Sequence, residues 1–338
     1  MKSIRWSFML LSGLSLLLIF ATAGLVAQNP FQSGTKYRTH FVIYNVQKKT
    51  TTPLFTIEGE WHAPNWTSDR KYVVSDMGGS IYRIPMSGTN IGKPEKIYGD
   101  PKVLLTNDHA LSWDSKQIAV SGITLPLPKN MRSAADIHNP ILIMNLDGST
   151  LHEVHLGWLH GWSPDSKYLV YTGIVDNNAD IYRIGSDGSG ELRMTTNKAE
   201  DDGPEYSADG KWVYFCSKRS SKWDAWRMPA DGAGPDDNLA EKITNSGDTQ
   251  DWFPHISPDG KWLYTISYPM DHPDHSYIGE GMKIKMLRLE NGVGAKGAEL
   301  TTVRTFFGGQ GAGNTGGWSP DSKRFVWTEY EKITEQAK

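Results

Sequence analysis

One short pattern recurs six times along this chain of 338 residues, and it constrains the fold more than any other feature. Each copy has an apolar residue, a polar turn around an aspartate, a lysine two residues later and a short apolar run, as in Gly161–Gly173. The six aspartates are Asp69, Asp114, Asp165, Asp209, Asp259 and Asp321. They stand 45, 51, 44, 50 and 62 residues apart. A four-stranded propeller blade needs roughly 40 to 50 residues, so the pattern predicts a ring of stacked β-sheets.

Within each copy the turn residues predict a β-hairpin. Pro-Asp-Gly and Pro-Asp-Ser favour tight turns, and the aspartate carboxylate can accept backbone N–H groups of its own turn. We therefore interpret the six aspartates as structural and not catalytic. An apolar residue stands three positions before each aspartate, which predicts packing between adjacent sheets. These expected core residues are Trp66, Leu111, Trp162, Tyr206, Ile256 and Trp318.

The two ends of the chain complement each other. Strands are expected at His40–Val46 and Thr52–Glu58, before the first repeat, and two more within Gly317–Tyr330. Pairing these four strands in one blade removes the exposed sheet edges. We expect an all-β fold: a six-bladed β-propeller of four-stranded antiparallel blades, closed by N- and C-terminal strands that share a blade. It forms one domain over 39–332, followed by a tail at 333–338.

The repeats also resemble those of a known family. WSPDSK at Trp162–Lys167 and SPDGK at Ser257–Lys261, with strands of the IYRI type and Asp-Gly turns, resemble the repeats of TolB-type β-propellers, which are relatives of the WD-repeat propellers. The resemblance covers about Thr39–Tyr330, the propeller part only, and we expect no counterpart of the N-terminal α/β domain of TolB. It implies a periplasmic propeller that acts as a binding module.

The first residues have the order of a secretory signal. Lys2 and Arg5 precede an apolar stretch at Phe8–Phe20, and small residues follow as far as Ala27. We expect a signal peptide over 1–27 and a linker over 28–38, and hence a periplasmic or secreted protein. The alternative is an uncleaved anchor at Phe8–Val26, which would be the one expected contact with a membrane.

Charge and cysteine content exclude several classes of protein. The formal net charge is -3 and the pI about 6.4, with no long basic run, so we expect no nucleic-acid binding. Cys216 is the single cysteine, which excludes an intramolecular disulfide and a lipoprotein. It lies in the apolar run WVYFCS and is expected to be packed, not reactive. We expect a monomer.

Candidate functional residues precede the anchor aspartates, on the innermost strands of the predicted blades, where propellers gather their ligands. Four histidines from four blades share this band, and imidazoles with a carboxylate or amide suit a divalent metal such as Mn, Zn, Fe or Ca. These expected metal ligands are His62, His109, His160 and His255. The alternative is that they hydrogen-bond between blades or stack on tryptophans. All candidate ligand-binding residues are His62, Asp108, His109, His160, Asp201, Asp202, Glu205, Trp252, His255, Gln310 and Asn314.

Three irregular segments interrupt the repeats. Phe306–Gly317 reads FFGGQGAGNTGG, and its glycines would let backbone N–H groups approach an anionic ligand while Gln310 and Asn314 reach inward. The alternative is a connecting loop without a ligand. Ile123–Asn139 and Pro269–Gly281 are insertions, and insertions on a rigid repeat scaffold commonly carry function.

Two functions from different classes remain open. One is an exported binding module whose channel mouth engages a cell-envelope protein or glycan. The alternative is a metal-dependent carbohydrate-active enzyme, an oligosaccharide lyase or hydrolase, with the histidines and carboxylates as metal ligands or as general acid and base. That layout is loosely similar to oligogalacturonate lyase, a propeller enzyme with His and Gln ligands to a divalent metal, by analogy alone. Converging histidine nitrogens would favour the enzyme.

Overall fold

The computed structural model describes residues 35–128, 137–272, 275 and 278–333. The predicted signal peptide, most of the predicted linker and nearly all of the tail lie outside these residues. Within them, no helix is long and apolar enough to cross a membrane. The helical elements of the described chain are the short 3-10 helices η3 (Pro235–Asp237) and η4 (Gln310–Ala312).

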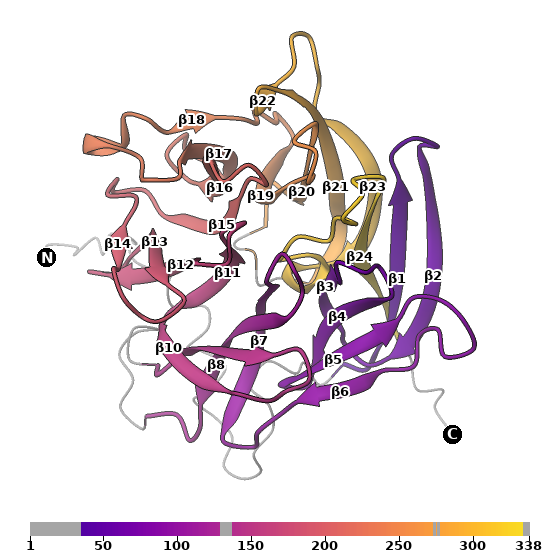
Figure 1. The fold of residues 1–338 in the computed structure, drawn as a ribbon. Helices are drawn as coiled ribbons and strands as arrows, with labels where there is room; N and C mark the ends of the chain where they lie inside the picture. The colour runs from indigo at the N-terminus through magenta and orange to yellow at the C-terminus, as the bar shows by residue number, and fades with distance from the viewer. Residues whose placement is uncertain (1–34, 129–136, 273–274, 276–277, 334–338) are drawn as a thin grey trace, which may run out of the picture.

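Six antiparallel sheets stand in a ring (Figure 1), which confirms the predicted six-bladed β-propeller. Blades 1 to 4 each run outward from the axis in chain order. Blade 1 contains β3 (His62–Trp66), β4 (Tyr72–Met77), β5 (Ser80–Pro85) and β6 (Glu95–Tyr98). Blade 2 contains β7 (Val103–Leu111), β8 (Gln117–Thr124), β9 (Pro140–Asn145) and β10 (His152–Leu156). Blade 3 contains β11 (Trp158–Trp162), β12 (Tyr168–Val175), β13 (Asn178–Gly185) and β14 (Leu192–Arg193). Blade 4 contains β15 (Asp201–Tyr206), β16 (Trp212–Ser217), β17 (Asp224–Pro229) and β18 (Glu241–Lys242).

Blades 5 and 6 depart from this order. Blade 5 contains β19 (Thr249–Ile256), β20 (Trp262–Pro269), β21 (Gly279–Glu290), the short β22 (Val293–Gly294) and the outer β23 (Thr301–Gly308). Blade 6 contains β24 (Arg324–Lys332), β1 (Tyr37–Asn45) and β2 (Thr50–Glu58). β24 and β1 pair antiparallel, so strands from both chain ends close the ring, as predicted. The innermost strand of blade 6 is reduced to one bridge, between Trp318 and Phe325.

The six tight turns are built alike. In blade 3, the Ser163 hydroxyl and the Lys167 backbone N–H both donate to Asp165 Oδ1, at 2.7 Å and 3.2 Å. The same two bonds recur in the other five turns. The residue after each aspartate has a φ between 55° and 70°. The structural interpretation of the six aspartates is therefore confirmed.

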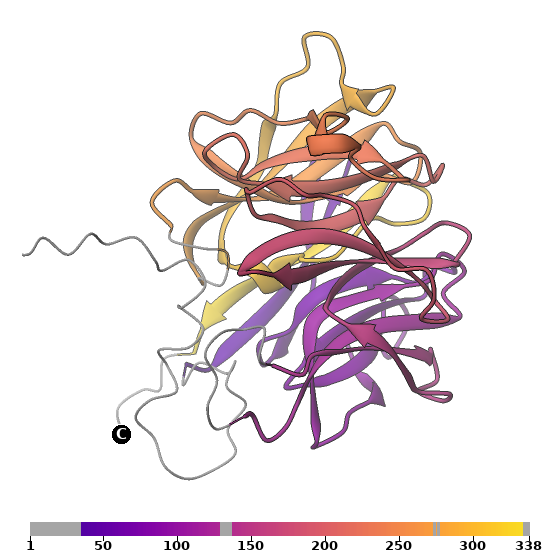
Figure 2. The same ribbon diagram turned by 90° about the vertical axis from the view of Figure 1, so that its left-hand side faces the viewer.

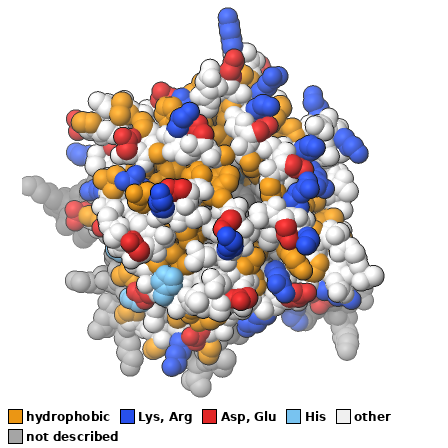
Figure 3. Space-filling view, viewed as in Figure 1, with side chains coloured by type: hydrophobic (Ala, Val, Ile, Leu, Met, Phe, Trp, Pro, Cys, Tyr) orange, Lys and Arg blue, Asp and Glu red, His pale blue; other side chains and the backbone are white. Residues whose placement is uncertain are grey.

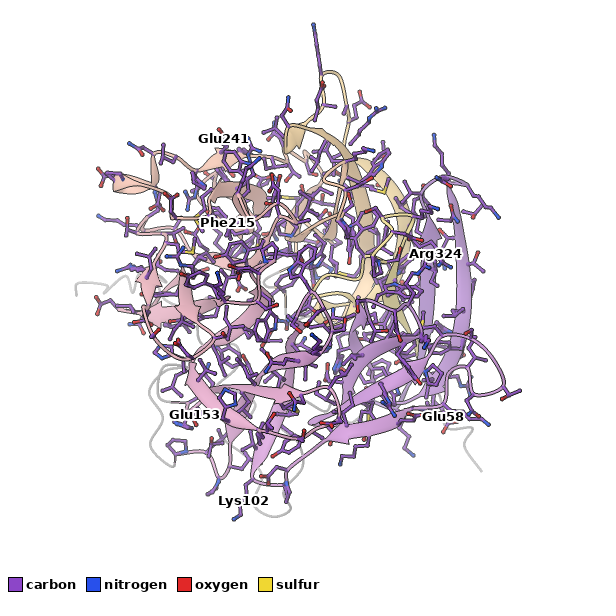
Figure 4. The ribbon with its side chains drawn as sticks, in the orientation of Figure 1. Glu58, Lys102, Glu153, Phe215, Glu241 and Arg324 are labelled. Atoms are coloured by element: carbon purple, nitrogen blue, oxygen red, sulfur yellow. The ribbon has the colours of Figure 1, made fainter. Side chains whose placement is uncertain are left out.

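The core lies between neighbouring blades, where side chains fill the space between sheets; Phe215, labelled in Figure 4, is fully buried there. Five of the six expected core residues are buried, while Leu111 is half-buried beside the cluster of blades 1 and 2. The indole N–H of Trp162 donates to the Ala110 carbonyl oxygen of the preceding blade, at 3.0 Å. Trp318 donates in the same way to the His255 carbonyl, at 3.0 Å. These tryptophans therefore join successive innermost strands.

Because the strands alternate in direction, the disc has two different faces, seen edge-on in Figure 2. The turn face carries the six aspartate turns. Five of the turn lysines lie 3.1 to 3.8 Å from the aspartate of their own turn. Figure 3 shows one face of the disc, on which Lys and Arg side chains are interspersed with Asp and Glu. The loop face, opposite, carries the connections into the innermost strands and both insertions. Tyr37 pairs with Lys332 at this end of blade 6.

Candidate functional site

Three innermost strands carry the same irregularity inside the band of candidate residues. Ala63, Gly203 and Phe253 each stand six residues before an anchor aspartate and have φ values of 46°, 64° and 48°. The pairing of β3, β15 and β19 shifts register at these positions. Such a bulge adds an unpaired residue and re-aims the side chains beside it. The left-handed backbone is strained for a residue as bulky as Phe253, whose ring stacks on His160 with centroids 5.9 Å apart.

The stretch Gly309–Gly317, named here the axial segment, passes between the innermost strands at the axis of the ring. The Asn314 side-chain amide donates to the Asp108 carboxylate of blade 2. The Asn65 amide of blade 1 donates to Thr315 Oγ1 at 2.9 Å. Asn314 and Asp108 are both buried. The axial segment therefore provides polar partners for the innermost strands of blades 1 and 2.

Blades 4 and 5 hold the other side of the axial segment. His255 bridges two partners, with Nδ1 2.7 Å from Glu205 Oε2 and Nε2 2.8 Å from the Gly313 carbonyl oxygen. The second oxygen of Glu205 accepts the Ile256 backbone N–H at 3.3 Å. A Cβ added at Gly316 would lie 2.8 Å from Glu205 Oε2. A side chain at this position would therefore displace the Glu205 carboxylate.

A charged group lies at the loop-face end of blade 1. His62 Nδ1 is 2.9 Å from Asp76 Oδ2, and its Nε2 is 3.2 Å from Glu60 Oε1. Burial alone would lower the pKa of His62, but the charges of Asp76 and Glu60 and the hydrogen bonds to them raise it to about 10. His109 is fully buried nearby, with Nδ1 3.7 Å from Asp76 Oδ1. Burial lowers the pKa of His109 against the charge of Asp76, which favours the neutral form of its ring.

A second ion pair joins blades 3 and 4. His160 Nε2 lies 3.3 Å from Asp202 Oδ1, which also accepts the Thr172 hydroxyl at 2.7 Å. Burial opposes both charges, yet their attraction raises the pKa of His160 and holds that of Asp202 far below its usual range. Burial also raises the pKa of the neighbouring Asp108, despite the His160 charge and the Asn314 amide.

The structure places two candidate residues in other surroundings. Asp201, although adjacent to Asp202, lies in the alternate side-chain direction of β15 and accepts Arg219 Nη2 at 2.9 Å and 2.7 Å. The same guanidinium is 3.2 Å from Asp237, and burial raises the pKa of Asp201 to about 6 despite the Arg219 charge. This network joins β15 to two connections of blade 4. Gln310 begins η4 and is half-buried.

The described part of the second insertion lies against blade 5. The Trp252 ring has its centroid 3.8 Å from that of Trp223 and 4.3 Å from that of His275. The Tyr268 hydroxyl donates to the His275 carbonyl oxygen at 2.9 Å. The charge of His275 also helps to lower the pKa of Asp202. The insertion therefore approaches the channel mouth at the His160–Asp202 pair.

The four candidate histidines do not share one centre. Both ring nitrogens of His62 and of His255 have hydrogen-bond partners, and His160 uses Nε2 for Asp202. Within the described ranges, no group of three or more His, Cys, Asp or Glu is arranged to hold a metal ion. The hydrogen-bonding alternative describes the contacts of His62 and His255, whereas the His109 ring nitrogens have no partner among the described residues, and metal binding stays a prediction.

Sequence reasoning missed several partners in this site. Asp76 faces His62 from the next strand, and the register of a predicted hairpin could have identified it. Glu60 lies two residues before His62, and Asn65 three residues after it, within the same innermost stretch. His275 lies in the insertion Pro269–Gly281 that the sequence indicated, but its contacts were not predictable, because the placement of an insertion depends on tertiary contacts.

Comparisons with known proteins find relatives that share this fold. No family model matches the chain. An uncharacterized protein of Agrobacterium fabrum is 32% identical over 300 residues, 88% of this chain and 94% of the relative. A solved structure from Agrobacterium tumefaciens, provisionally named TolB, has a TM-score of 0.76 and 31% identity, covering 88% of this chain and 99% of its own. TolB from Acinetobacter baumannii has a TM-score of 0.53 and 15% identity, covering 87% of this chain and 64% of its own, and shows the fold alone.

Proposed function

Since the chain belongs to the TolB-type β-propeller family, we propose that it is an exported binding module whose loop face engages a protein of the cell envelope. The observation that carries this proposal is the axial segment: Gly309–Gly317 lies at the axis and hydrogen-bonds to Asn65, Asp108 and His255 from three blades. These contacts favour binding on a face of the disc over binding within the axis.

The loop face is the better candidate of the two. It carries both insertions and the charged group of Glu60, His62 and Asp76, in which the Glu60 and His62 side chains keep 15% and 20% of their surface exposed. The turn face repeats one small hairpin six times, and its lysines are matched by their own aspartates. Surfaces that depart from a repeat are where specific recognition is expected.

Site-specific photo-crosslinking in intact cells tests this assignment. A benzoylphenylalanine probe would replace Met270 on the loop face, 48% exposed, or Trp113 on the turn face, 39% exposed. We expect crosslinks to one envelope protein from Met270 and none from Trp113. The two positions are matched because both are exposed apolar side chains of similar accessibility.

Crosslinks from Trp113 alone would contradict the choice of face. The alternative, a carbohydrate-active enzyme, would be supported instead by manganese-dependent cleavage of a polyuronide by the purified protein. Export has its own test: mass spectrometry of the protein from the periplasmic fraction should find Gln28 as the first residue if the predicted signal peptide is removed after Ala27.

A further inference from the structure

One of the six anchor turns carries a residue that the repeat does not require. In five blades the residue directly before the anchor aspartate is proline or a small residue: Ser68, Pro164, Ala208, Pro258 and Pro320. Blade 2 has Trp113 at this position, the second residue of a turn that the Ser115 N–H closes on the Ser112 carbonyl. Proline is favoured at this place in a tight turn, and turn chemistry gives no preference for tryptophan. Trp113 therefore needs an explanation outside the turn.

Trp113 also differs from the other tryptophans in its exposure. It keeps 39% of its surface exposed, whereas every other tryptophan within the described ranges is buried or half-buried. Its indole N–H donates to the Trp162 carbonyl oxygen of blade 3 at 3.2 Å. Since this bond occupies the one polar atom of the side chain, what the side chain exposes is apolar ring. Leaving such a ring in water is unfavourable, and aromatic rings are enriched where proteins bind other molecules.

The Trp113 ring is held in place by the blades on both sides. Trp162, which accepts its N–H, is buried and donates its own indole N–H back to the Ala110 carbonyl oxygen of blade 2 at 3.0 Å. On the other side, Ser115 Oγ of the same turn accepts the Ser68 N–H of blade 1 at 2.8 Å. A side chain that is already ordered loses little conformational freedom when a ligand binds. Trp113 is therefore a preorganised contact surface.

The surroundings of Trp113 are polar and without net charge. Asp114 and Lys116 of the same turn form an ion pair of 3.1 Å, and Asp165 and Lys167 of the blade 3 turn form another of 3.4 Å. All four side chains are exposed. The carboxylates can accept hydrogen bonds from hydroxyl groups, and the ammonium groups can donate to them. One apolar ring thus lies among both donors and acceptors.

This combination fits a saccharide better than a protein. A pyranose ring has an apolar C–H face that can stack on an indole, and hydroxyl groups that donate and accept. A protein interface needs a larger apolar centre. The other exposed large apolar side chains of the described turn face lie in connections to the outer strands and not in anchor turns; they are Ile91, Leu151 and Leu239. The balanced charges favour a neutral sugar.

We propose that Trp113 is the stacking platform of a binding site for a neutral saccharide, on the turn face where blades 2 and 3 meet. The Asp114–Lys116 and Asp165–Lys167 pairs bond to the hydroxyl groups of the sugar. The site is separate from the loop face and does not rest on the protein partner proposed for that face. A single platform binds weakly, so we expect a Kd of about 1 mM.

Saturation-transfer difference NMR of the mature full chain with the N-acetylglucosamine tetramer tests the site. Wild-type protein should transfer saturation mainly to protons on the apolar face of the sugar. Trp113→Phe keeps an aromatic face without the bond to Trp162 and should retain the signal, whereas Trp113→Pro has the proline of three other blades and should lose it. Leu151→Ser is the matched control, because Leu151 is an apolar side chain of the same face, 37% exposed, and this variant should bind as the wild type does.

Three results would overturn the proposal: no signal from the wild type, a signal that survives in Trp113→Pro, or a stronger signal from the acidic trigalacturonate than from the neutral tetramer. A wild-type experiment decides the question if the proline variant does not fold. In nitrogen-15 spectra, the Trp113 indole resonance, identified by its loss in Trp113→Phe, should shift most among the indoles as the tetramer is added. An unmoved Trp113 resonance would exclude the site.

Discussion

The turn face and the loop face of this disc are made by the same six blades, yet their residues follow opposite rules. On the turn face the Asp165 arrangement is repeated in every blade, with a hydroxyl and a backbone N–H on one carboxylate oxygen. On the loop face His62, Asp202 and His275 each have surroundings of their own. A residue that is repeated in all six blades therefore has a structural role. A residue that differs between blades is specific to this propeller and is a candidate for function.

The largest loss of stability should come from removing a loop-face carboxylate that has a structural role. Asp201→Ala leaves the buried Arg219 without its main partner, which should cost about 3–5 kcal/mol in the free energy of unfolding. Urea unfolding measures this loss. Asp187→Ala, in an exposed turn where Asp187 accepts Ser189, should change the free energy of unfolding far less and serves as control. Equal losses in the two variants would show that burial does not distinguish these positions.

The next effect concerns pH. The pKa of His62 is about 10 in the fold and about 6.5 in the unfolded chain, so its protonation stabilises the fold fully below pH 6.5. That stabilisation declines as pH rises and is lost above pH 10. The two pKa values together imply about 5 kcal/mol, which should disappear between these pH values in the wild type and not in His62→Gln, measured by unfolding at a series of pH values. Parallel pH profiles for the two proteins would refute the raised pKa.

A smaller effect is expected on the turn face. Asp165→Ala removes the acceptor of Ser163 and of the Lys167 backbone, and should cost about 1 kcal/mol. Lys167→Ala removes an exposed ion pair of 3.4 Å and should change stability by less than about 0.5 kcal/mol. Thermal unfolding of both variants measures the difference. A larger loss in the lysine variant would mean that the ion pair, and not the turn, holds this face together.

The smallest effect has the opposite sign. Ser166 has a φ of 57°, and the equivalent Gly210 has a φ of 70°, a conformation that glycine adopts without strain. Ser166→Gly should therefore stabilise the fold by about 0.5 kcal/mol, and Gly210→Ala should destabilise it by about 1 kcal/mol. Calorimetry of the pair measures both. If Ser166→Gly were destabilising, the hydroxyl would have a role that its backbone conformation does not reveal.

The sequence predicted where most of the candidate residues lie in the fold, but it predicted few of their contacts. Position-by-position comparison placed His62, His109, His160 and His255 on innermost strands, where the structure has them. The same comparison could not separate Asp201 from Asp202, although they face different surroundings. It also suggested converging imidazoles, whereas His62 and His255 are each occupied by their own carboxylates.

The sequence by itself determined the repeat, the number of blades and the closure of the ring, because turn chemistry and alternation act over a few residues and six copies report the same rule. Tertiary structure alone decided that Gly309–Gly317 lies at the axis and that Asp76 lies beside both His62 and His109. The reason is physical: pairing across the axis joins residues as distant in sequence as Asp108 and Asn314, and nothing local to either one specifies the other.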